Sequence, residues 1–291
     1  MAEKNECHNS FKRIILITGS TDGIGRQTAL ELAVRNKENF VIVHGRNIEK
    51  CEATIDYIMR EGKLPDKSNL DFVVGDFSDL KEVSDLATDV QKRFPLLNVL
   101  LCNAGVLLPK RAESRNGLEL TFQVNYLAHY ILSRSLFSLL KKNVPSRLVL
   151  VSSICYEWYS LDWSDLESSK TYEKYTQYSR TKLMIHLMTF KLARLFSRSG
   201  VTCNVLEPGI IETKLLRAGG YSGVPVCEGS RSCVFLCTSD SVTNVNGAYY
   251  DRNCKRITKL FKDAVDEKQQ ENLWQLTDKL CEKKGIKLPK I

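Results

Sequence analysis

The sequence predicts an α/β fold in which one doubly wound parallel sheet of about seven strands carries helices on both faces. Apolar runs of strand length alternate with longer stretches of helical periodicity, and the runs themselves show almost no alternation of apolar and polar residues. Such runs are typical of parallel strands covered on both sides, and their repeated alternation with helices is typical of a doubly wound sheet. The predicted strands are 14–18, 40–44, 70–74, 99–102, 148–152, 201–206 and 247–250.

Helical periodicity fills the intervals between these runs. No internal repeat, low-complexity tract or linker interrupts the pattern, so we expect residues 1–291 to form a single domain with a polar tail at 1–11 and a helical extension at about 255–291. Segments 155–170 and 217–228 fit no regular period and are expected to be loops. The predicted helices are 25–36, 48–61, 79–94, 117–143, 171–199 and 266–284.

The composition is that of an ordinary globular protein, with 43% hydrophobic and 26% charged residues. The net charge is +8, but Lys and Arg are interspersed with acidic residues, which predicts a solvated surface and no nucleic-acid site. The ten cysteines are irregularly spaced and no histidine cluster accompanies them, so we expect reduced thiols and no metal site. Reduced thiols indicate the cytoplasm. No window reaches the roughly 20 apolar residues of a membrane span, so we expect no transmembrane segment.

A glycine-rich turn follows the first predicted strand and opens the first helix. Glycines there let backbone N–H groups approach a pyrophosphate, and the helix N-terminus adds partial positive charge. The spacing is G-x3-G-x-G and no Gly-Lys-Ser/Thr follows, which excludes the phosphate loop of nucleotide hydrolases. A glycine turn can also be a mere tight connection, but its place in the first strand–helix unit favours a dinucleotide site. The residues concerned are Gly19, Ser20, Thr21, Asp22, Gly23, Ile24 and Gly25.

The end of the second strand bears on the choice of nucleotide. An acidic residue there binds the free ribose hydroxyls of NAD, whereas an arginine can bind the 2′-phosphate of NADP. The chain has Arg46 and no acid at this point, which favours NADP(H). Asp22 in the glycine turn counts against a further phosphate nearby.

Tyr178 and Lys182 lie four residues apart in a strongly helical stretch, so their side chains share one face. A tyrosine ordinarily loses its proton near pH ~10. A neighbouring ammonium stabilises the phenolate, which predicts a lowered pKa and a role for Tyr178 as acid and base. The pair alone is weak evidence, because tyrosine and lysine often occur at this spacing by chance.

The motifs of the chain, taken together, resemble those of the short-chain dehydrogenase/reductase superfamily. Thr18-Gly19-x3-Gly23-x-Gly25 is followed in order by Asn103-Ala104-Gly105, Asn125, Ser152-Ser153, Tyr178-x3-Lys182 and Pro208-Gly209, and the resemblance covers roughly residues 12–250. Asn116-Gly117-Leu118-Glu119 and the segment 122–130 are similar to the retinol dehydrogenase-like branch. The resemblance implies a Rossmann-like fold and an NADP-dependent oxidoreductase.

The resemblance also implies roles for individual residues. Tyr178 would exchange the hydroxyl proton, Ser153 would hold the substrate oxygen, and Lys182 would polarise Tyr178 and bind the nicotinamide ribose. Asn125 would interrupt its helix and hold a water that relays protons from Lys182. The expected cofactor contacts are the glycine turn (19–25), Arg46, Asp76, Phe77, Asn103, Ala104, Gly105, Tyr178, Lys182, Pro208, Gly209 and Thr213.

We therefore expect an enzyme that interconverts an alcohol and a carbonyl on a small apolar substrate, a retinoid, a steroid or another aldehyde or ketone, walled by the segments 156–163 and 217–226. The alternative is a catalytically idle sensor or scaffold that binds NADP(H). The resemblance also makes a homodimer possible, with the helices of Asn125 and Tyr178 at its interface. The amphipathic stretch near Leu273 is expected to pack on the core, and peripheral association with a membrane stays open.

Overall fold

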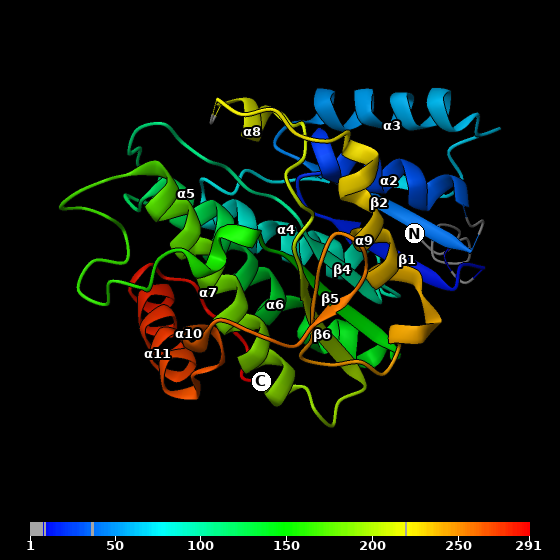
Figure 1. Cartoon of the computed structure of the whole chain (residues 1–291). Coiled ribbons are helices and arrows are strands. Elements are labelled where there is room, and N and C mark those ends of the chain that lie inside the picture. The colour runs from blue at the N-terminus through cyan, green and yellow to red at the C-terminus, as the bar shows by residue number, and fades with distance from the viewer. Residues whose placement is uncertain (1–7, 9, 36–37, 219) are drawn as a thin grey trace.

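The computed structural model describes residues 8, 10–35, 38–218 and 220–291. Eight strands form one sheet in the order β3-β2-β1-β4-β5-β6-β7-β8, and only β8 is antiparallel to its neighbour. Figure 1 labels its strands β2, β1, β4, β5 and β6. The predicted doubly wound α/β fold is confirmed. The prediction missed β8, which has only two residues and no apolar run. The strands are β1 (Arg13–Ile17), β2 (Asn39–Gly45), β3 (Leu70–Val74), β4 (Val99–Cys102), β5 (Ser146–Val151), β6 (Val201–Leu206), β7 (Tyr249–Tyr250) and β8 (Arg256–Ile257).

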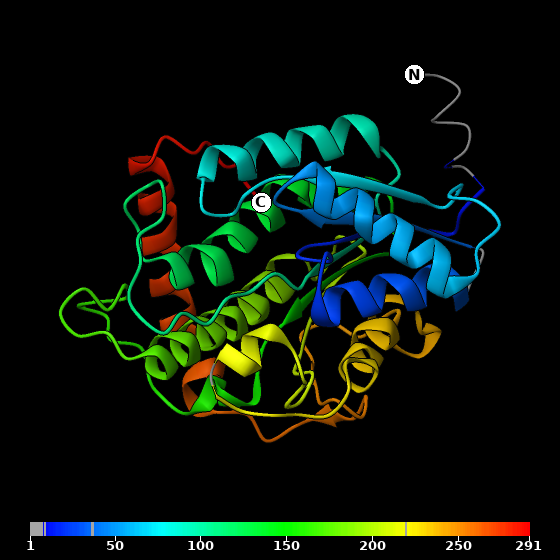
Figure 2. The ribbon, with the colours of Figure 1, turned by 90° about the horizontal axis from the view of Figure 1, so that it is seen from above.

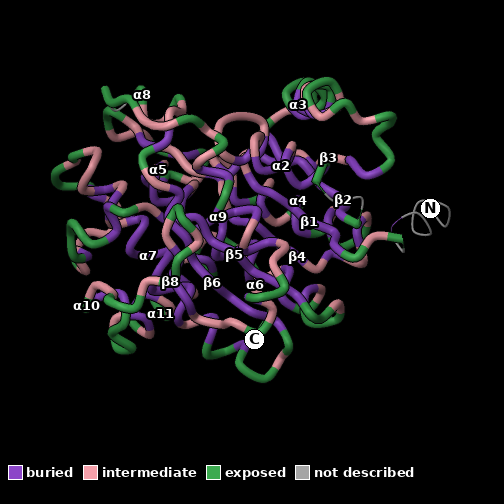
Figure 3. The backbone as a smooth tube through the Cα atoms, turned by 45° about the vertical axis from the view of Figure 1, so that its right-hand side comes forward, coloured by how far each residue is buried: buried purple, intermediate pink, exposed green. Residues whose placement is uncertain are grey.

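Helices cover both faces of this sheet (Figure 2). One layer contains α2 (Gly23–Arg35), α3 (Ile48–Gly62) and α9 (Val226–Thr238), and the other contains α4 (Leu80–Arg93), α6 (Ala128–Lys142) and α7 (Lys174–Leu195). Strand β1 serves both layers, because Ile15 and Ile17 point into the α2 side while Ile14 and Leu16 point into the α4 side. Strands β1, β2, β4, β5 and β6 are buried along their whole length, as their apolar runs predict, whereas β3 is only partly buried and β8 is accessible (Figure 3).

The predicted helix 117–143 is interrupted. It begins with one turn, α5 (Leu120–Phe122), continues as a π-helical turn, η1 (Gln123–Leu127), and only then becomes α6. Asn125 lies at the centre of η1, whose widened hydrogen bond runs from the N–H of Ala128 to the carbonyl of Gln123. The interruption expected at Asn125 is therefore present, and π-turns of this kind frequently occur at functional sites.

The C-terminal extension covers the outer side of the second helical layer. It contains β8, a short helix α10 (Lys262–Val265) and α11 (Glu267–Lys283), which lies beside α7 in Figures 1 and 2. Leu273 and Cys281 are buried in the core, and the Trp274 ring packs edge-on against Tyr130 at 4.9 Å between centroids. The amphipathic stretch thus packs on the core, as expected.

The predicted polar tail at 1–11 lies largely outside the described residues. Within it, His8 and Phe11 pack their rings on Phe40 of β2, at 4.5 Å and 5.5 Å between centroids. This part of the tail is therefore attached to the core. The remaining short elements are η2 (Ile154–Glu157), α8 (Lys214–Ala218) and η3 (Asp240–Val242).

Candidate active site

The carboxyl ends of β1 and β4 form the point at which the strand order reverses. From β1 the sheet continues to β2 and β3, and from β4 it continues in the opposite direction to β5 and β6. Ligands of open α/β sheets bind in the crevice at such a point. The glycine turn after β1 and the loop that begins at Asn103 after β4 both lie there, as the sequence predicted.

These two loops are packed directly on each other. The amide of Asn103 donates to the carbonyls of Thr18 at 2.9 Å and Gly19 at 3.1 Å. A Cβ atom at Gly19, whose φ is +63°, would lie 2.7 Å from the Cα of Ala104, and one at Gly25 would lie 2.5 Å from the Asn103 amide nitrogen. Both glycines are therefore required by the packing, whatever they do for a ligand.

Several donors of the glycine turn are already engaged inside the protein. The Ser20 hydroxyl donates to the carbonyl of Ile17 and accepts from the N–H of His44, and the N–H of Gly19 donates to His44 Nδ1 at 3.0 Å. Ser20 is buried, so it fixes the turn to β2. Among the predicted contacts, the first-turn N–H groups of Ile24 and Gly25 are better placed to meet a phosphate, because a helix N-terminus leaves such donors without intrahelical partners.

The negative charge of Asp22 is compensated. Lys214, at the start of α8, lies with Nζ 2.7 Å from an Asp22 carboxylate oxygen. Although burial opposes ionisation, the hydrogen bonds from Lys214 and from the N–H of Gly23 hold the pKa of Asp22 below its usual value. Thr213 lies beside Gly23, since a Cβ on that glycine would be 3.2 Å from the Thr213 methyl. The loop after β6 thus lies against the glycine turn, and its Lys214 offsets the Asp22 charge that disfavours a phosphate.

Three of the predicted cofactor contacts occupy different environments. Arg46 is exposed directly beyond β2, and Asp76 after β3 is half-buried with one carboxylate oxygen accepting from the N–H of Ser78 at 2.9 Å. Phe77, in contrast, is buried, and its ring stacks on His44 at 4.7 Å between centroids. Only the backbone of Phe77 is therefore left for a nucleotide.

The structure brings Ser153, Tyr178 and Lys182 together at the carboxyl end of β5. The Ser153 hydroxyl lies near enough to the Tyr178 phenol to lower its pKa, and Lys182 Nζ lies 5.4 Å from the centre of the Tyr178 ring. Lys182 is buried and donates to the carbonyl of Val151, the last residue of β5, at 3.0 Å. This placement joins α7 to the strand that Ser153 follows.

The pKa shifts in this cluster are dominated by burial. Burial raises the pKa of Tyr178, with the nearby Cys155 acting in the same direction and the Ser153 hydroxyl opposing it. Burial also lowers the pKa of Lys182 to about 8. The lowering of the Tyr178 pKa by Lys182, which the sequence predicted, is not found. A Tyr178 that keeps its proton is the form that can donate it to a carbonyl oxygen.

Asn125 connects this cluster to the loop after β4. Its side-chain oxygen accepts from the N–H of Val106 at 2.7 Å, and its side-chain nitrogen donates to the Val106 carbonyl at 3.0 Å and to the Thr181 hydroxyl at 3.1 Å. Gly105 lies between the two sites, because a Cβ there would be 3.4 Å from the Asn125 oxygen and 3.7 Å from Lys182 Nζ. The side chain of Asn125 therefore fixes the loop after β4. The proton relay expected at this residue would have to use its backbone carbonyl.

Sequence reasoning missed His129, which binds that backbone. Its Nδ1 lies 2.9 Å from the carbonyl of Asn125 and its Nε2 lies 3.0 Å from the Thr18 hydroxyl. Since a carbonyl only accepts, Nδ1 carries the proton, and Thr18 donates to Nε2 while accepting the N–H groups of Asn103 and Ala104. The spacing of four residues from Asn125 inside a helix was the available signal.

A second missed group fixes α7 just before Tyr178. The carboxylate of Glu119 is buried, accepts the N–H groups of Thr121 and Phe122 at the start of α5, and accepts from the Gln177 amide at 2.8 Å. This carboxylate links the start of the helix that holds Asn125 to the residue preceding Tyr178.

The loop after β6 begins with a buried acid. Glu207 accepts the N–H groups of Gly209 at 2.6 Å and Arg252 at 3.1 Å, and burial raises its pKa. Gly209 has φ +87°, a conformation that favours glycine. Pro208 and Gly209 therefore form a fixed turn that leads toward Thr213 and the glycine turn.

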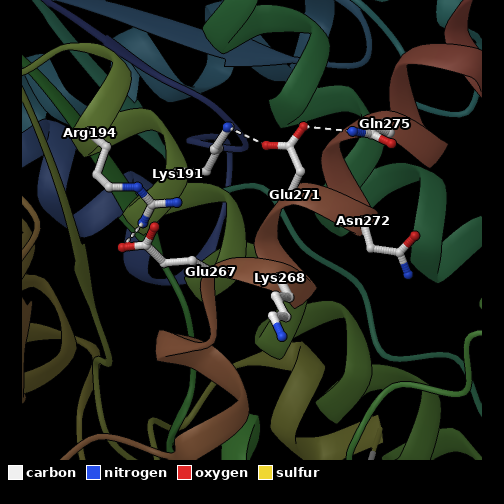
Figure 4. Close-up of a pocket in the computed structure, with 7 residues that line it drawn as sticks. All are labelled: Lys191, Arg194, Glu267, Lys268, Glu271, Asn272 and Gln275. Atoms are coloured by element: carbon white, nitrogen blue, oxygen red, sulfur yellow. Dashed lines mark hydrogen bonds and ion pairs between the residues drawn. The ribbon is translucent and has the colours of Figure 1, made fainter.

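The surface has one hollow beside these loops and another farther away. One of about 230 Å³ lies beside the glycine turn and is lined by Asp22, Arg26, Tyr57 and Lys214 among others. A larger one of about 510 Å³ lies between α7 and α11 and is lined by charged side chains such as Lys191 and Glu267 (Figure 4). Lys191 is 13 residues beyond Tyr178 on the same helix, roughly 20 Å away at 1.5 Å per residue, so the larger hollow is separate from the Tyr178 cluster.

Three aromatic residues of the segments expected to wall a substrate are exposed. Trp158 and Tyr159 follow η2 and are exposed, while Tyr221 beyond α8 is exposed and contacts the Tyr175 ring edge-on at 6.0 Å between centroids. Within the described ranges, no helix is long and apolar enough to cross a membrane. The described side chains likewise contain no group of three or more His, Cys, Asp or Glu that could hold a metal ion.

Comparisons with known proteins agree with this geometry. The model of the short chain dehydrogenase family matches residues 13–219. The chain is 33% identical to retinol dehydrogenase 14 of Mus musculus over 290 residues, which cover 91% of this chain and 85% of that protein. It is 30% identical to polyprenol dehydrogenase of Homo sapiens over 292 residues, which cover 94% of this chain and 86% of that protein.

Solved structures share the fold. An uncharacterized protein from Mycobacterium paratuberculosis is similar with a TM-score of 0.77 at 24% identity, over 96% of each chain. A short chain dehydrogenase from Shigella flexneri, complexed with NADP, is similar with a TM-score of 0.67 at 23% identity, over 84% of this chain and 98% of that one.

The fold, the cluster at the end of β5 and the match over residues 13–219 define the class: the chain belongs to the short-chain dehydrogenase/reductase family. Within that family it belongs to the retinol dehydrogenase-like branch, as its similarity to retinol dehydrogenases 12, 13 and 14 shows.

Proposed function

We propose that the chain is an NADP(H)-dependent oxidoreductase that interconverts a carbonyl and an alcohol on an apolar substrate, a retinoid, a steroid or another aldehyde or ketone. The observation that carries this proposal is the cluster of Ser153, Tyr178 and Lys182 beside the crevice between β1 and β4. A proton donor, a hydrogen-bond donor and a cation there face the place where a dinucleotide would end.

Each residue of the cluster has a separate role in the proposed reaction. A bound nicotinamide supplies or accepts the hydride. Tyr178 donates its proton to the carbonyl oxygen in reduction and receives it in oxidation. Ser153 donates a hydrogen bond to the same oxygen as negative charge develops on it. Lys182, held by the Val151 carbonyl, lies with Nζ 5.4 Å from the centre of the Tyr178 ring and is proposed to bind the nicotinamide ribose.

Three observations support NADP(H) over NAD(H). Arg46 is exposed at the end of β2, where a 2′-phosphate would lie. Lys214 compensates the charge of Asp22 in the glycine turn. The structurally similar Shigella flexneri protein is itself complexed with NADP. The remaining predicted contacts in the glycine turn, at 103–105 and at 208–213 border the same crevice and are proposed to meet this nucleotide.

The apolar nature of the substrate is proposed from the surroundings and the relatives. Exposed aromatic residues, Trp158, Tyr159 and Tyr221, follow the carboxyl ends of β5 and β6. The similar proteins named above are dehydrogenases of retinol and polyprenol, both long apolar alcohols. A cytoplasmic location and one domain over residues 1–291 are part of the same proposal.

Pairing of two copies through the helices of Asn125 and Tyr178 is disfavoured by α11. Its Asp278 accepts from Tyr130 and Arg134 of α6 at 2.8 Å each, and its Glu271 pairs with Lys191 of α7. We propose that any homodimer uses a different face.

The test of this function is NADPH oxidation by the purified chain, followed at its absorbance, with retinal, a steroid ketone, a quinone and a simple aldehyde. The proposal expects turnover with at least one apolar carbonyl and little with NADH. Tight NADPH binding without turnover on any member of the panel would favour the alternative, an idle sensor or scaffold that binds NADP(H).

A further inference from the structure

Cys155 is placed directly against the hydroxyl of Ser153. It lies in η2, two residues after Ser153, and only 4% of it is exposed. Its Sγ donates to Ser153 Oγ at 3.2 Å, and its N–H reaches the same oxygen at a longer 3.5 Å. The other side of the residue is fixed as well, because its carbonyl accepts from the buried Ser179 hydroxyl of α7 at 2.5 Å.

A serine hydroxyl has one proton to donate and two lone pairs that accept. When the thiol and the N–H of Cys155 both donate to Ser153 Oγ, both lone pairs are occupied. The single proton of Ser153 is then left for a different acceptor, and Tyr178, whose pKa the Ser153 hydroxyl lowers, is its neighbour on that side.

We propose that Cys155 is a positioning residue for Ser153: its thiol donates to Ser153 Oγ and directs the Ser153 proton toward the oxygen held beside Tyr178. The hydrogen bond itself is independent of the reaction, whereas its catalytic consequence rests on the proposed function. In that reaction a directed proton stabilises the developing negative charge on the substrate oxygen, because a donor that is already oriented needs no reorganisation.

The chemistry of the thiol suits this task. Burial raises the pKa of Cys155, although Ser153 and Lys182 act against the rise, so the S–H proton is retained at neutral pH. A thiol is a weak donor, and its bond to Ser153 therefore orients the hydroxyl without competing strongly for it. Cys155 is thus a thiol that donates and not a thiolate that attacks.

Infrared spectroscopy of the S–H stretch tests the bond without any turnover. The spectrum of the wild-type chain minus that of Cys155→Ala isolates the band of this thiol from the other cysteines. We expect this band to move to higher wavenumber in Ser153→Ala, because the acceptor is lost. A band that Ser153→Ala leaves unmoved shows that Cys155 does not donate to Ser153 and overturns the proposal.

Kinetics test the consequence. With the best carbonyl of the panel and NADPH, Cys155→Ala should lower kcat by about 5- to 10-fold, equivalent to about 1 to 1.4 kcal/mol, with an unchanged KM for NADPH. Cys155→Ser keeps a donor and should restore kcat to within about twofold. The matched control is Cys237→Ala in α9, which removes an equally buried thiol remote from Ser153 and should retain full kcat.

A wild-type kcat in Cys155→Ala, or a Cys155→Ser variant as impaired as Cys155→Ala, contradicts the positioning role. If the wild-type chain turns over no carbonyl at all, the proposed function fails, while the infrared result still decides whether Cys155 orients Ser153.

Discussion

The ring of His129 donates from Nδ1 to the backbone carbonyl of Asn125 at 2.9 Å, and its Nε2 accepts from the Thr18 hydroxyl at 3.0 Å. One buried imidazole thereby joins the π-turn of the Asn125 helix to the residue that begins the glycine turn. The nucleotide crevice and the catalytic cluster are thus held in one hydrogen-bonded unit.

Replacement of His129 should therefore be costly. His129→Leu leaves the Thr18 hydroxyl and the Asn125 carbonyl without this partner, and we expect a loss of roughly 2 to 4 kcal/mol in the free energy of unfolding. His186→Leu is the control, because both ring nitrogens of this buried histidine lack a hydrogen-bond partner among the described residues. Urea unfolding of both variants should show the loss only for His129, and equal losses would contradict the linking role.

The buried histidines also predict how stability depends on pH. Burial lowers the pKa of His44 to about 4 and those of His129 and His186 to about 3. The folded chain keeps them neutral, whereas the unfolded chain takes up protons below its ordinary pKa of about 6.5. Stability should thus be complete above that pH and decline as the pH falls, by about 1.4 kcal/mol per histidine per pH unit well below it. Urea midpoints that stay flat between pH 7.5 and 5 would refute this expectation.

Arg46 should decide between the two nucleotides. Arg46→Asp removes the proposed partner of the 2′-phosphate and places a negative charge there, so NADPH binding should weaken much more than NADH binding. Lys50→Asp, an exposed charge reversal on α3, is the matched control and should change both affinities little. Equal losses for the two nucleotides in Arg46→Asp would mean that Arg46 does not bind the phosphate.

The ion pair between Asp22 and Lys214 predicts a coupling between two single variants. Lys214→Ala leaves Asp22 uncompensated beside the proposed phosphates, so the Kd for NADPH should rise by about 5-fold, a typical scale for a partly exposed charge. Adding Asp22→Asn should restore most of the affinity. Titration of NADPH fluorescence measures both, and a double variant no better than Lys214→Ala would show that the pair does not protect the phosphate site.

Much of the fold could be predicted from periodicity. The strands of a parallel sheet are buried on both faces, so they appear in the sequence as continuous apolar runs. β8 could not, since its two residues, Arg256 and Ile257, are paired only through the position of β7. The break at Asn125 was expected from resemblance, but its π-helical form depends on packing around α6 that periodicity does not contain.

The candidate site, too, could be predicted only in part. Its sequence pattern predicts where strands end and which residues share a helix face, and this brings Ser153, Tyr178 and Lys182 together. The pKa of Tyr178 was expected in the wrong direction, because the sequence shows a lysine one turn away but not the burial that outweighs it. Contacts that join distant segments, such as Asp22 with Lys214, carry no local signal at all.

The central claim is that Tyr178 supplies the proton, and Tyr178→Phe tests it most directly because only the hydroxyl is removed. We predict that turnover of the best carbonyl with NADPH falls by about 100-fold or more, while NADPH still binds with its wild-type affinity. Turnover equal to that of the wild-type chain, with the nucleotide bound as before, would contradict the account.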